Sequence, residues 1–176
     1  MAASDPHPGS NPHPPGLLAG LSAPALHERL DEEIARAERQ GTPLCCLLVA
    51  IENLDELARR HGRELVEHTL DYVEGILQRE LRRFDRIGRP SDGELLLLLP
   101  GADGPRGEIV ARRVLERLRT VKVEADGVRR PLRISVGLAT WRADLGGDDL
   151  LAQMRSAANT APNGDSSPAL QQPGPS

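Results

Sequence analysis

Five consecutive leucines, Leu95 to Leu99, constrain the fold of this 176-residue chain more than any other stretch. They follow a turn-forming segment, Pro90-Ser91-Asp92-Gly93, whose glycine accepts the positive φ that tight hairpin turns require. An apolar run without a polar break avoids water on both faces only when it lies inside a core. Residues 84–88 and 94–99 are therefore predicted to form a β-hairpin whose second strand is buried.

The other apolar patterns predict a mixed sheet covered by helices. Leu44 to Ile51 is a second unbroken apolar run, typical of a central strand, and Leu132 to Trp141 alternates as a strand with one buried face does. A further short strand is expected at 121–123, before a hairpin-type turn at Asp126-Gly127. Apolar residues at helical spacing predict five helices, at residues 26–39, 54–61, 64–79, 105–118 and 150–159. Because each helix has one apolar face, the natural arrangement is an α/β fold with helices packed around one sheet.

Composition confines the expected domain to the middle of the chain. Residues 1–16 form a proline-rich segment and residues 160–176 are rich in Pro, Ser, Gly and Gln, so both are expected to be disordered tails around a domain at 17–159. No run approaches the ~20 apolar residues of a membrane span, and no secretory signal is visible. We therefore expect a cytoplasmic protein that does not bind membranes.

Net charge and cysteine content argue against a nucleic-acid-binding protein and against a disulfide or cysteine metal site. A net charge of −4 and 2% aromatic residues argue against nucleic acid as a partner, because such proteins usually carry basic stripes or stacking platforms. Cys45 and Cys46 are adjacent within an apolar strand, where neighbouring side chains point to opposite faces. Buried reduced thiols are the expectation for this pair, rather than a disulfide or a metal site.

Several segments together resemble the GGDEF family, the diguanylate cyclase domains that condense two GTP into cyclic di-GMP. The resemblance implies a palm-like fold of the nucleotidyl-cyclase kind, with a mixed central sheet surrounded by helices. The segments that carry it are Leu18-Ala-Gly-Leu21 at the entry to the domain, Leu48-Val-Ala-Ile-Glu52 at the strand that ends in D-x-D in the family, Ser91-Asp-Gly-Glu-Leu95 at the signature pentapeptide, and Ser135-Val-Gly-Leu-Ala139.

The resemblance also implies an active site, and this chain lacks its metal ligands. Condensing nucleoside triphosphates requires Mg²⁺ held by carboxylate oxygens. In the family, the ligands are the first Asp of D-x-D and the acidic third residue of the signature, and these positions hold Ala50 and Gly93. Ser91 and Asp92 replace the two glycines that approach GTP, and Asp92 would repel phosphates. We therefore expect no catalytic residues at Ala50, Ser91, Asp92, Gly93 and Glu94, no cofactor, and Mg²⁺ only with residual cyclase activity.

Other positions of the implied active site are also altered. The guanine-reading Asn of the family is replaced by Ala58, the partnering Asp has a stand-in in Glu67, and the phosphate-facing Lys falls near Pro162. Glu52, Asp92 and Glu94 are carboxylates from two adjoining strand ends and remain weak candidates for a rearranged metal site. The alternative for Asp92 and Glu94 is a solvated hairpin tip.

A second site implied by the resemblance is intact. The family binds its product at an inhibitory R-x-x-D motif before the signature, with a further Arg from the helix that follows, and these positions hold Arg82, Asp85 and Arg113. A guanidinium can address the guanine O6 and N7 acceptors in a bidentate way, and arginines compensate phosphate charge. The alternative is an arginine-rich solvated surface, since several other arginines lie close by.

The sequence leaves three hypotheses for function. The first is a catalytically inactive GGDEF domain that binds cyclic di-GMP through the R-x-x-D site, or a protein partner of unknown identity, or both. The second is a residual diguanylate cyclase, and the third is an interaction scaffold without a ligand. Cyclic di-GMP bridges two copies in this family, so the resemblance further implies a ligand-linked homodimer and a bacterial cytoplasm.

Overall fold

The structure, a computed structural model, describes residues 20–160 and the backbone of 169–170. It contains the helices α1 (Ala23–Gln40), α2 (Leu54–His61), α3 (Arg63–Glu80), α4 (Gly104–Arg119) and α5 (Gly147–Thr160). Its strands are β1 (Leu44–Ile51), β2 (Arg86–Gly88), β3 (Glu94–Pro100), β4 (Lys122–Ala125), β5 (Val128–Pro131), β6 (Ile134–Thr140) and β7 (Ala169–Leu170). The expected N-terminal tail and most of the expected C-terminal tail lie outside the described residues.

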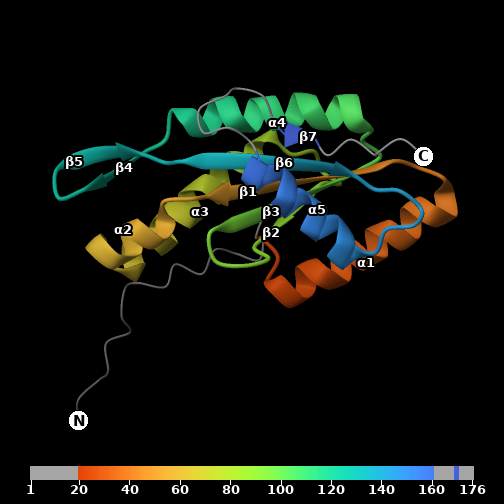
Figure 1. The fold of residues 1–176 in the computed structure, drawn as a ribbon, viewed down its shortest axis with the longest axis horizontal. Coiled ribbons are helices and arrows are strands. Elements are labelled where there is room, and N and C mark those ends of the chain that lie inside the picture. The colour runs from red at the N-terminus through yellow and green to blue at the C-terminus, as the bar shows by residue number, and fades with distance from the viewer. Residues whose placement is uncertain (1–19, 161–168, 171–176) are drawn as a thin grey trace, which may run out of the picture.

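The main sheet is mixed and has the strand order β2-β3-β1-β6-β7. β1 lies at its centre and is antiparallel to both β3 and β6, whereas β7 is parallel to β6. The predicted hairpin is confirmed, because β2 pairs antiparallel with β3 and Leu95 to Leu99 are at most 1% exposed. Helices lie on both sides of this sheet (Figure 1).

The unbroken apolar strands are explained by the two helical layers. Leu95, Leu97 and Leu99 of β3 face one core, which α3 and α4 complete with Val73, Leu77, Val114 and Leu118. Leu96 and Leu98 face the other core, which α1 and α5 complete with Leu26, Leu30, Leu150 and Met154. Because successive side chains of a strand point to opposite faces, a strand between two apolar layers has no position for a polar residue.

One hairpin is longer than its sequence pattern predicts. The chain turns at Asp126 and Gly127, which have φ of 53° and 74°, and the turn joins β4 to β5. Positive φ at both central residues is typical of the tight turn that joins the two strands of a hairpin with a two-residue loop. β5 was not predicted, because its four residues, which lie just before the alternating segment 132–141, are all exposed and show no alternation of apolar and polar positions. These two strands form a separate sheet that projects at the left of Figure 1.

The last strand is a second difference from expectation. Ala169–Leu170 fall within the expected C-terminal tail, yet they form β7 beside Gly137 and Leu138 of β6. The outer edge of β6 would otherwise present unpaired backbone groups, and pairing with a short strand satisfies some of them. The sequence has no strand pattern here because backbone pairing at an edge does not require apolar side chains.

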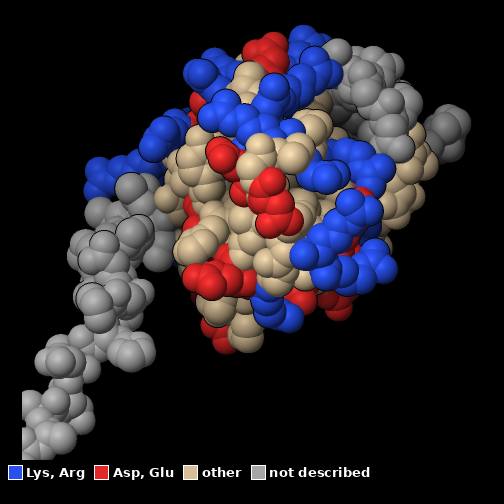
Figure 2. All heavy atoms as spheres, turned by 90° about the vertical axis from the view of Figure 1, so that its left-hand side faces the viewer, with Lys and Arg blue, Asp and Glu red and all other residues tan. Residues whose placement is uncertain are grey.

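The surface of the described residues carries both signs of charge. Figure 2 faces the end where β4 and β5 project, and it shows basic side chains gathered at the top, where α4 lies, with both signs interspersed below. Arg119 and Lys122, at the end of α4 and the start of β4, are both exposed. No helix in the described part of the chain has the length and apolar character needed to cross a membrane.

The two cysteines are predicted to be unreactive in the folded protein. Both are fully buried, and burial raises the pKa of the Cys45 thiol to about 11 and that of Cys46 well above its ordinary value. At pH 8, a thiol of pKa about 11 is roughly one-thousandth ionised, and the thiolate is the reactive form. We expect a thiol reagent at pH 8 to modify the native protein at least ~100-fold more slowly than the urea-unfolded protein. Rapid modification of one thiol per native chain would contradict this burial.

Candidate functional site

The positions of the expected metal ligands do meet at one end of the sheet. Ala50 pairs with Glu94 of β3 on one side and with Ser135 of β6 on the other. Gly93, just before β3, accepts a hydrogen bond at its carbonyl from the Ile51 amide (2.9 Å) and has a φ of 78°. The geometry therefore places the two substituted positions side by side, and neither carries a side-chain oxygen that could bind a metal ion.

Glu94, a carboxylate at this end of the sheet, is paired with a cation of the protein itself. Arg155 of α5 donates to Glu94 from Nη2 (2.8 Å) and from Nε (3.0 Å), and the Ser91 hydroxyl donates to the same carboxylate. Burial opposes ionisation of Glu94, but the hydrogen bonds from Arg155 and Ser91 outweigh it and lower the pKa of this carboxyl. Sequence reasoning missed Arg155, because nothing in the sequence indicates that this residue of α5 contacts Glu94.

The three weak candidates for a metal site, Glu52, Asp92 and Glu94, do not converge on a common point, and two of them contact different arginines. Asp92 is 93% exposed at its side chain and lies 3.8 Å from Arg63, while Glu94 is bound by Arg155. Glu52 lies just beyond the end of β1 and is exposed. In the described part of the chain, no group of three or more His, Cys, Asp or Glu side chains is arranged to hold a metal ion. The hairpin tip is thus an ion-paired, largely solvated surface.

A second arginine that the sequence did not reveal lies in the loop between β2 and β3. Arg89 contacts three carboxylates of α3: Glu67 at 3.2 Å, Asp71 at 2.7 Å and Glu74 at 3.0 Å. Glu67 is the residue expected to stand in for the Asp that partners the guanine-reading Asn of the family, and in this structure it binds Arg89. The spacing i, i+4, i+7 of the three acids puts them on one face of α3, but it does not indicate which arginine they bind. The contacts connect the loop to the helical layer.

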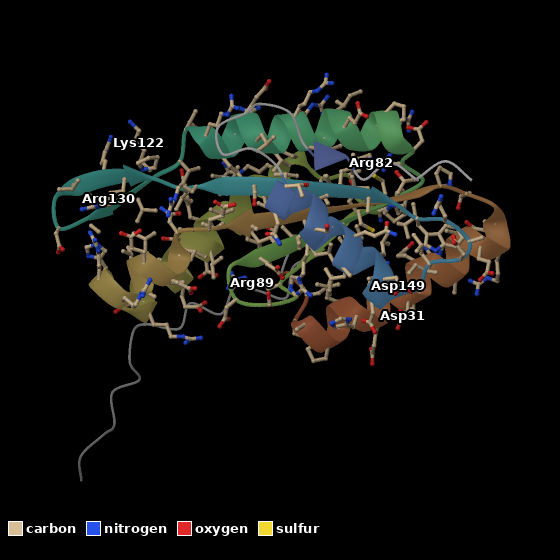
Figure 3. The ribbon with its side chains drawn as sticks, viewed as in Figure 1. Asp31, Arg82, Arg89, Lys122, Arg130 and Asp149 are labelled. Atoms are coloured by element: carbon tan, nitrogen blue, oxygen red, sulfur yellow. The ribbon has the colours of Figure 1, made fainter. Side chains whose placement is uncertain are left out.

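Arg82 and Asp85 form a closed pair in the turn between α3 and β2. Asp85 accepts from the Arg82 backbone amide (2.7 Å) and from Arg82 Nη2 (3.2 Å), and its side chain is only 3% exposed. Arg82 Nη2 also donates to the Pro100 carbonyl at the end of β3 (3.2 Å), and the Arg82 side chain is 52% exposed. Asp85 therefore orients Arg82, and its own carboxylate is covered (Figure 3 labels Arg82).

Arg113 extends from the outer part of α4 and is exposed, with no ion pair or hydrogen bond to any residue in the described part of the chain. It lies one helical turn before Arg117, which donates to Glu80 near the end of α3 (2.9 Å). Residues four apart on a helix share a face, so Arg113 lies on the side of α4 that faces the end of α3. This places it on the same side of the sheet as the turn that holds Arg82.

The two candidate sites lie at opposite ends of β3. Glu94 begins the strand and Pro100, whose carbonyl binds Arg82, ends it. At ~3.3 Å per residue, the two ends are separated by roughly 20 Å. The changes at the metal positions therefore need not disturb the arginine-bearing turn.

A comparison of the sequence with models of known protein families shows which family this chain belongs to. The family model for the diguanylate cyclase GGDEF domain matches residues 23–165. This match covers most of the chain. The chain belongs to the GGDEF family.

Characterised relatives of this GGDEF domain are bacterial. The diguanylate cyclase DgcP of Pseudomonas aeruginosa is 34% identical over 103 residues, which make up 58% of this chain and 15% of that protein. The diguanylate cyclase DosC of Escherichia coli is 27% identical over 126 residues, 71% of this chain and 27% of that protein. The chain thus spans about a quarter or less of the length of these two relatives.

Solved structures confirm the fold. The diguanylate cyclase SiaD of Pseudomonas aeruginosa, in complex with its activator SiaC, matches with a TM-score of 0.74 at 24% identity over 82% of this chain and 55% of that one. The GGDEF domain of DgcB from Caulobacter crescentus, in complex with c-di-GMP, matches with a TM-score of 0.74 at 16% identity over 82% and 86%. The FimX GGDEF domain of Pseudomonas aeruginosa gives 0.75 at 14% identity over 89% and 97%.

Proposed function

We propose that this GGDEF domain has no cyclase activity and acts in cyclic di-GMP signalling in the bacterial cytoplasm as a receptor for cyclic di-GMP. The observation that carries the proposal is the contrast between the two ends of β3. At one end the metal positions are Ala50 and Gly93, and at the other end Arg82 exposes its guanidinium group, with a further exposed guanidinium, that of Arg113, on the helix that follows the strand.

The loss of catalysis follows from charge. Two triphosphates bring many negative charges together, and a divalent ion held by carboxylates normally compensates them. Here the carboxylate of Glu94 is neutralised by Arg155, and Asp92 adds an exposed negative charge nearby. The residues present do not fit a Mg²⁺ site, so the proposal includes no cofactor.

Binding of the cyclic dinucleotide follows from the two exposed guanidinium groups, of Arg82 and Arg113. Arg82 is fixed by Asp85 and by the Pro100 carbonyl, so little conformational entropy is lost when its exposed side contacts a guanine or a phosphate. Arg113 supplies a second exposed guanidinium from α4, and two guanidinium groups suit a ligand with two phosphates. Asp85 is a positioning residue in this arrangement, because its carboxylate is covered and already accepts from the Arg82 amide and guanidinium. The DgcB complex with c-di-GMP supports the proposal that a domain of this fold binds this ligand. The SiaD complex with SiaC supports the proposal that a domain of this fold binds a protein partner.

Two measurements on the purified full chain test the proposal. Incubation with GTP and Mg²⁺ or Mn²⁺ is expected to give no cyclic di-GMP above a protein-free blank, and turnover would show that the domain is a residual cyclase. Titration calorimetry with cyclic di-GMP is expected to show saturable binding below tens of micromolar. An absence of saturable binding would leave the chain as an interaction scaffold.

Matched variants locate the binding site. Removing one charged hydrogen-bonding group typically weakens binding by roughly 10- to 100-fold, so Arg82→Ala and Arg113→Ala should each do so. Arg112→Ala, on the same helix but ion-paired with Glu108 at 3.8 Å, is the control and should bind as the unmodified chain does. Equal affinity of all three variants would place the ligand elsewhere. Sedimentation of the complex is expected to show a ligand-linked homodimer.

A further inference from the structure

The chain has one phenylalanine, and it lies at the surface. Phe84 is 71% exposed, whereas the leucines of β1 and β3 are at most 1% exposed. Fully burying such a side chain stabilises the folded state by about 1.5–3 kcal/mol, and Phe84 contributes little of this free energy because it is exposed. A single exposed apolar residue is common on protein surfaces. The surroundings of Phe84 are therefore what distinguish it.

The turn that carries Phe84 is held from two sides. Asp85 donates from its amide to the Arg82 carbonyl (3.0 Å), and its carboxylate accepts from the Arg82 amide (2.7 Å). Arg86 donates from Nη1 to the carbonyls of Arg83 (3.0 Å) and Asp85 (2.8 Å). Both carbonyls that flank Phe84 are thus bound by one guanidinium. The ring is presented on an ordered backbone, and it has no part in either core.

Two arginines precede Phe84 in the chain, and a further exposed arginine lies on α4. Arg82 and Arg83 immediately precede Phe84, and Arg83 is exposed, with no side-chain hydrogen bond or ion pair to any other described residue. Arg113 lies on the face of α4 turned toward this end of α3. An exposed ring on a fixed turn among guanidinium groups is the arrangement by which proteins stack nucleobases and bind their phosphates.

We infer that Phe84 is the residue on which a guanine base of the bound cyclic dinucleotide stacks. The inference deepens the proposed function and depends on it. Stacking on an aromatic ring accepts any base, so Phe84 supplies affinity for the base plane. Discrimination for guanine comes from the guanidinium groups, which address O6 and N7. The apolar ring is exposed because its partner is the ligand.

Calorimetric titration of the full chain with cyclic di-GMP tests this role. Loss of one base–aromatic stack corresponds to roughly 5- to 150-fold weaker binding, so Phe84→Ala should show a loss in that range. Phe84→Tyr retains the ring and should bind within about 2-fold of the unmodified chain. Tyr72→Ala removes another exposed aromatic, 63% exposed on α3, and should leave the affinity unchanged. Unchanged thermal unfolding would show that each variant is folded, as expected for surface positions.

A spectroscopic readout reports the stack itself. Phe84→Trp in a Trp141→Phe background places the only indole of the chain at the turn. Saturation with cyclic di-GMP is expected to quench its fluorescence, whereas the Phe84→Ala, Trp141→Phe protein should show no change.

The outcomes separate the inference from the proposed function. If the unmodified chain shows no binding, both are overturned. If it binds and Phe84→Ala binds equally well, or Phe84→Tyr loses as much affinity as Phe84→Ala, the stacking role alone is overturned. If Phe84→Ala weakens binding and the tyrosine variant does not, the inference is supported.

Discussion

Replacing Gly137 by Ala is expected to destabilise this protein by at least about 3 kcal/mol, toward the upper end of the effects of overpacking. A Cβ at this position of β6 would lie 2.0 Å from the Met154 carbonyl oxygen and 2.9 Å from the Ala158 amide nitrogen, both in the backbone of α5. Backbone atoms cannot change rotamer, so α5 would have to move away from the sheet. The same movement would separate Arg155 from Glu94.

Urea denaturation followed by circular dichroism measures this effect as a lower transition midpoint. Gly75→Ala is the matched control, because a Cβ on Gly75 in α3 meets no atom within 4 Å. That change should be stabilising by up to about 1 kcal/mol, since alanine favours helix over glycine. Equal midpoints for Gly137→Ala and the unmodified protein would mean that α5 does not pack against β6 in this way.

Replacing Asp85 by Ala is expected to cost about 2–3 kcal/mol of stability and to remove most of the binding of cyclic di-GMP. Asp85 is 7% exposed, and its carboxylate satisfies both the Arg82 amide and the Arg82 guanidinium. Alanine leaves a backbone donor without a partner, a loss of roughly 1–3 kcal/mol, and frees Arg82 from its fixed orientation. Because Arg82 remains half exposed, water limits the loss from the ion pair itself.

Thermal unfolding and calorimetric titration of the same preparations separate the two effects. Asp31→Ala removes an exposed carboxylate from α1 and should change stability by less than about 0.5 kcal/mol, with no effect on binding. Asp85→Asn retains one acceptor oxygen and should fall between alanine and aspartate in stability. Binding that survives Asp85→Ala undiminished would show that Arg82 does not need this orientation to hold the ligand.

Much of the fold was readable from apolar patterns. The runs at Leu44 to Ile51 and Leu95 to Leu99 predicted two central strands, and both lie between helical layers as expected. The hairpin before the leucine run was also predicted, although β2 begins at Arg86 because Arg82 to Asp85 form a turn. β5 and β7 were missed, since each is defined by backbone pairing and not by an apolar pattern.

The candidate site was also predictable from the sequence only in part. That Ala50 and Gly93 replace metal ligands follows from the resemblance alone, and the structure adds that the two positions are neighbours. The partners of the remaining charges were not readable. Arg155 reaches Glu94 across 61 positions of sequence, and a single sequence contains no signal for which of its many acids a given arginine will contact.

The sequence by itself predicted the family and the two buried strands, and through the resemblance it predicted that the metal carboxylates are replaced, because these predictions depend on residue type and local periodicity. Only the tertiary structure decided which charges are free. Asp85 is covered and Arg113 is exposed, yet both are charged residues next to other charged residues in the chain. Burial and pairing depend on which elements pack together, so the same residue types can close a turn at one place and remain available to a ligand at another.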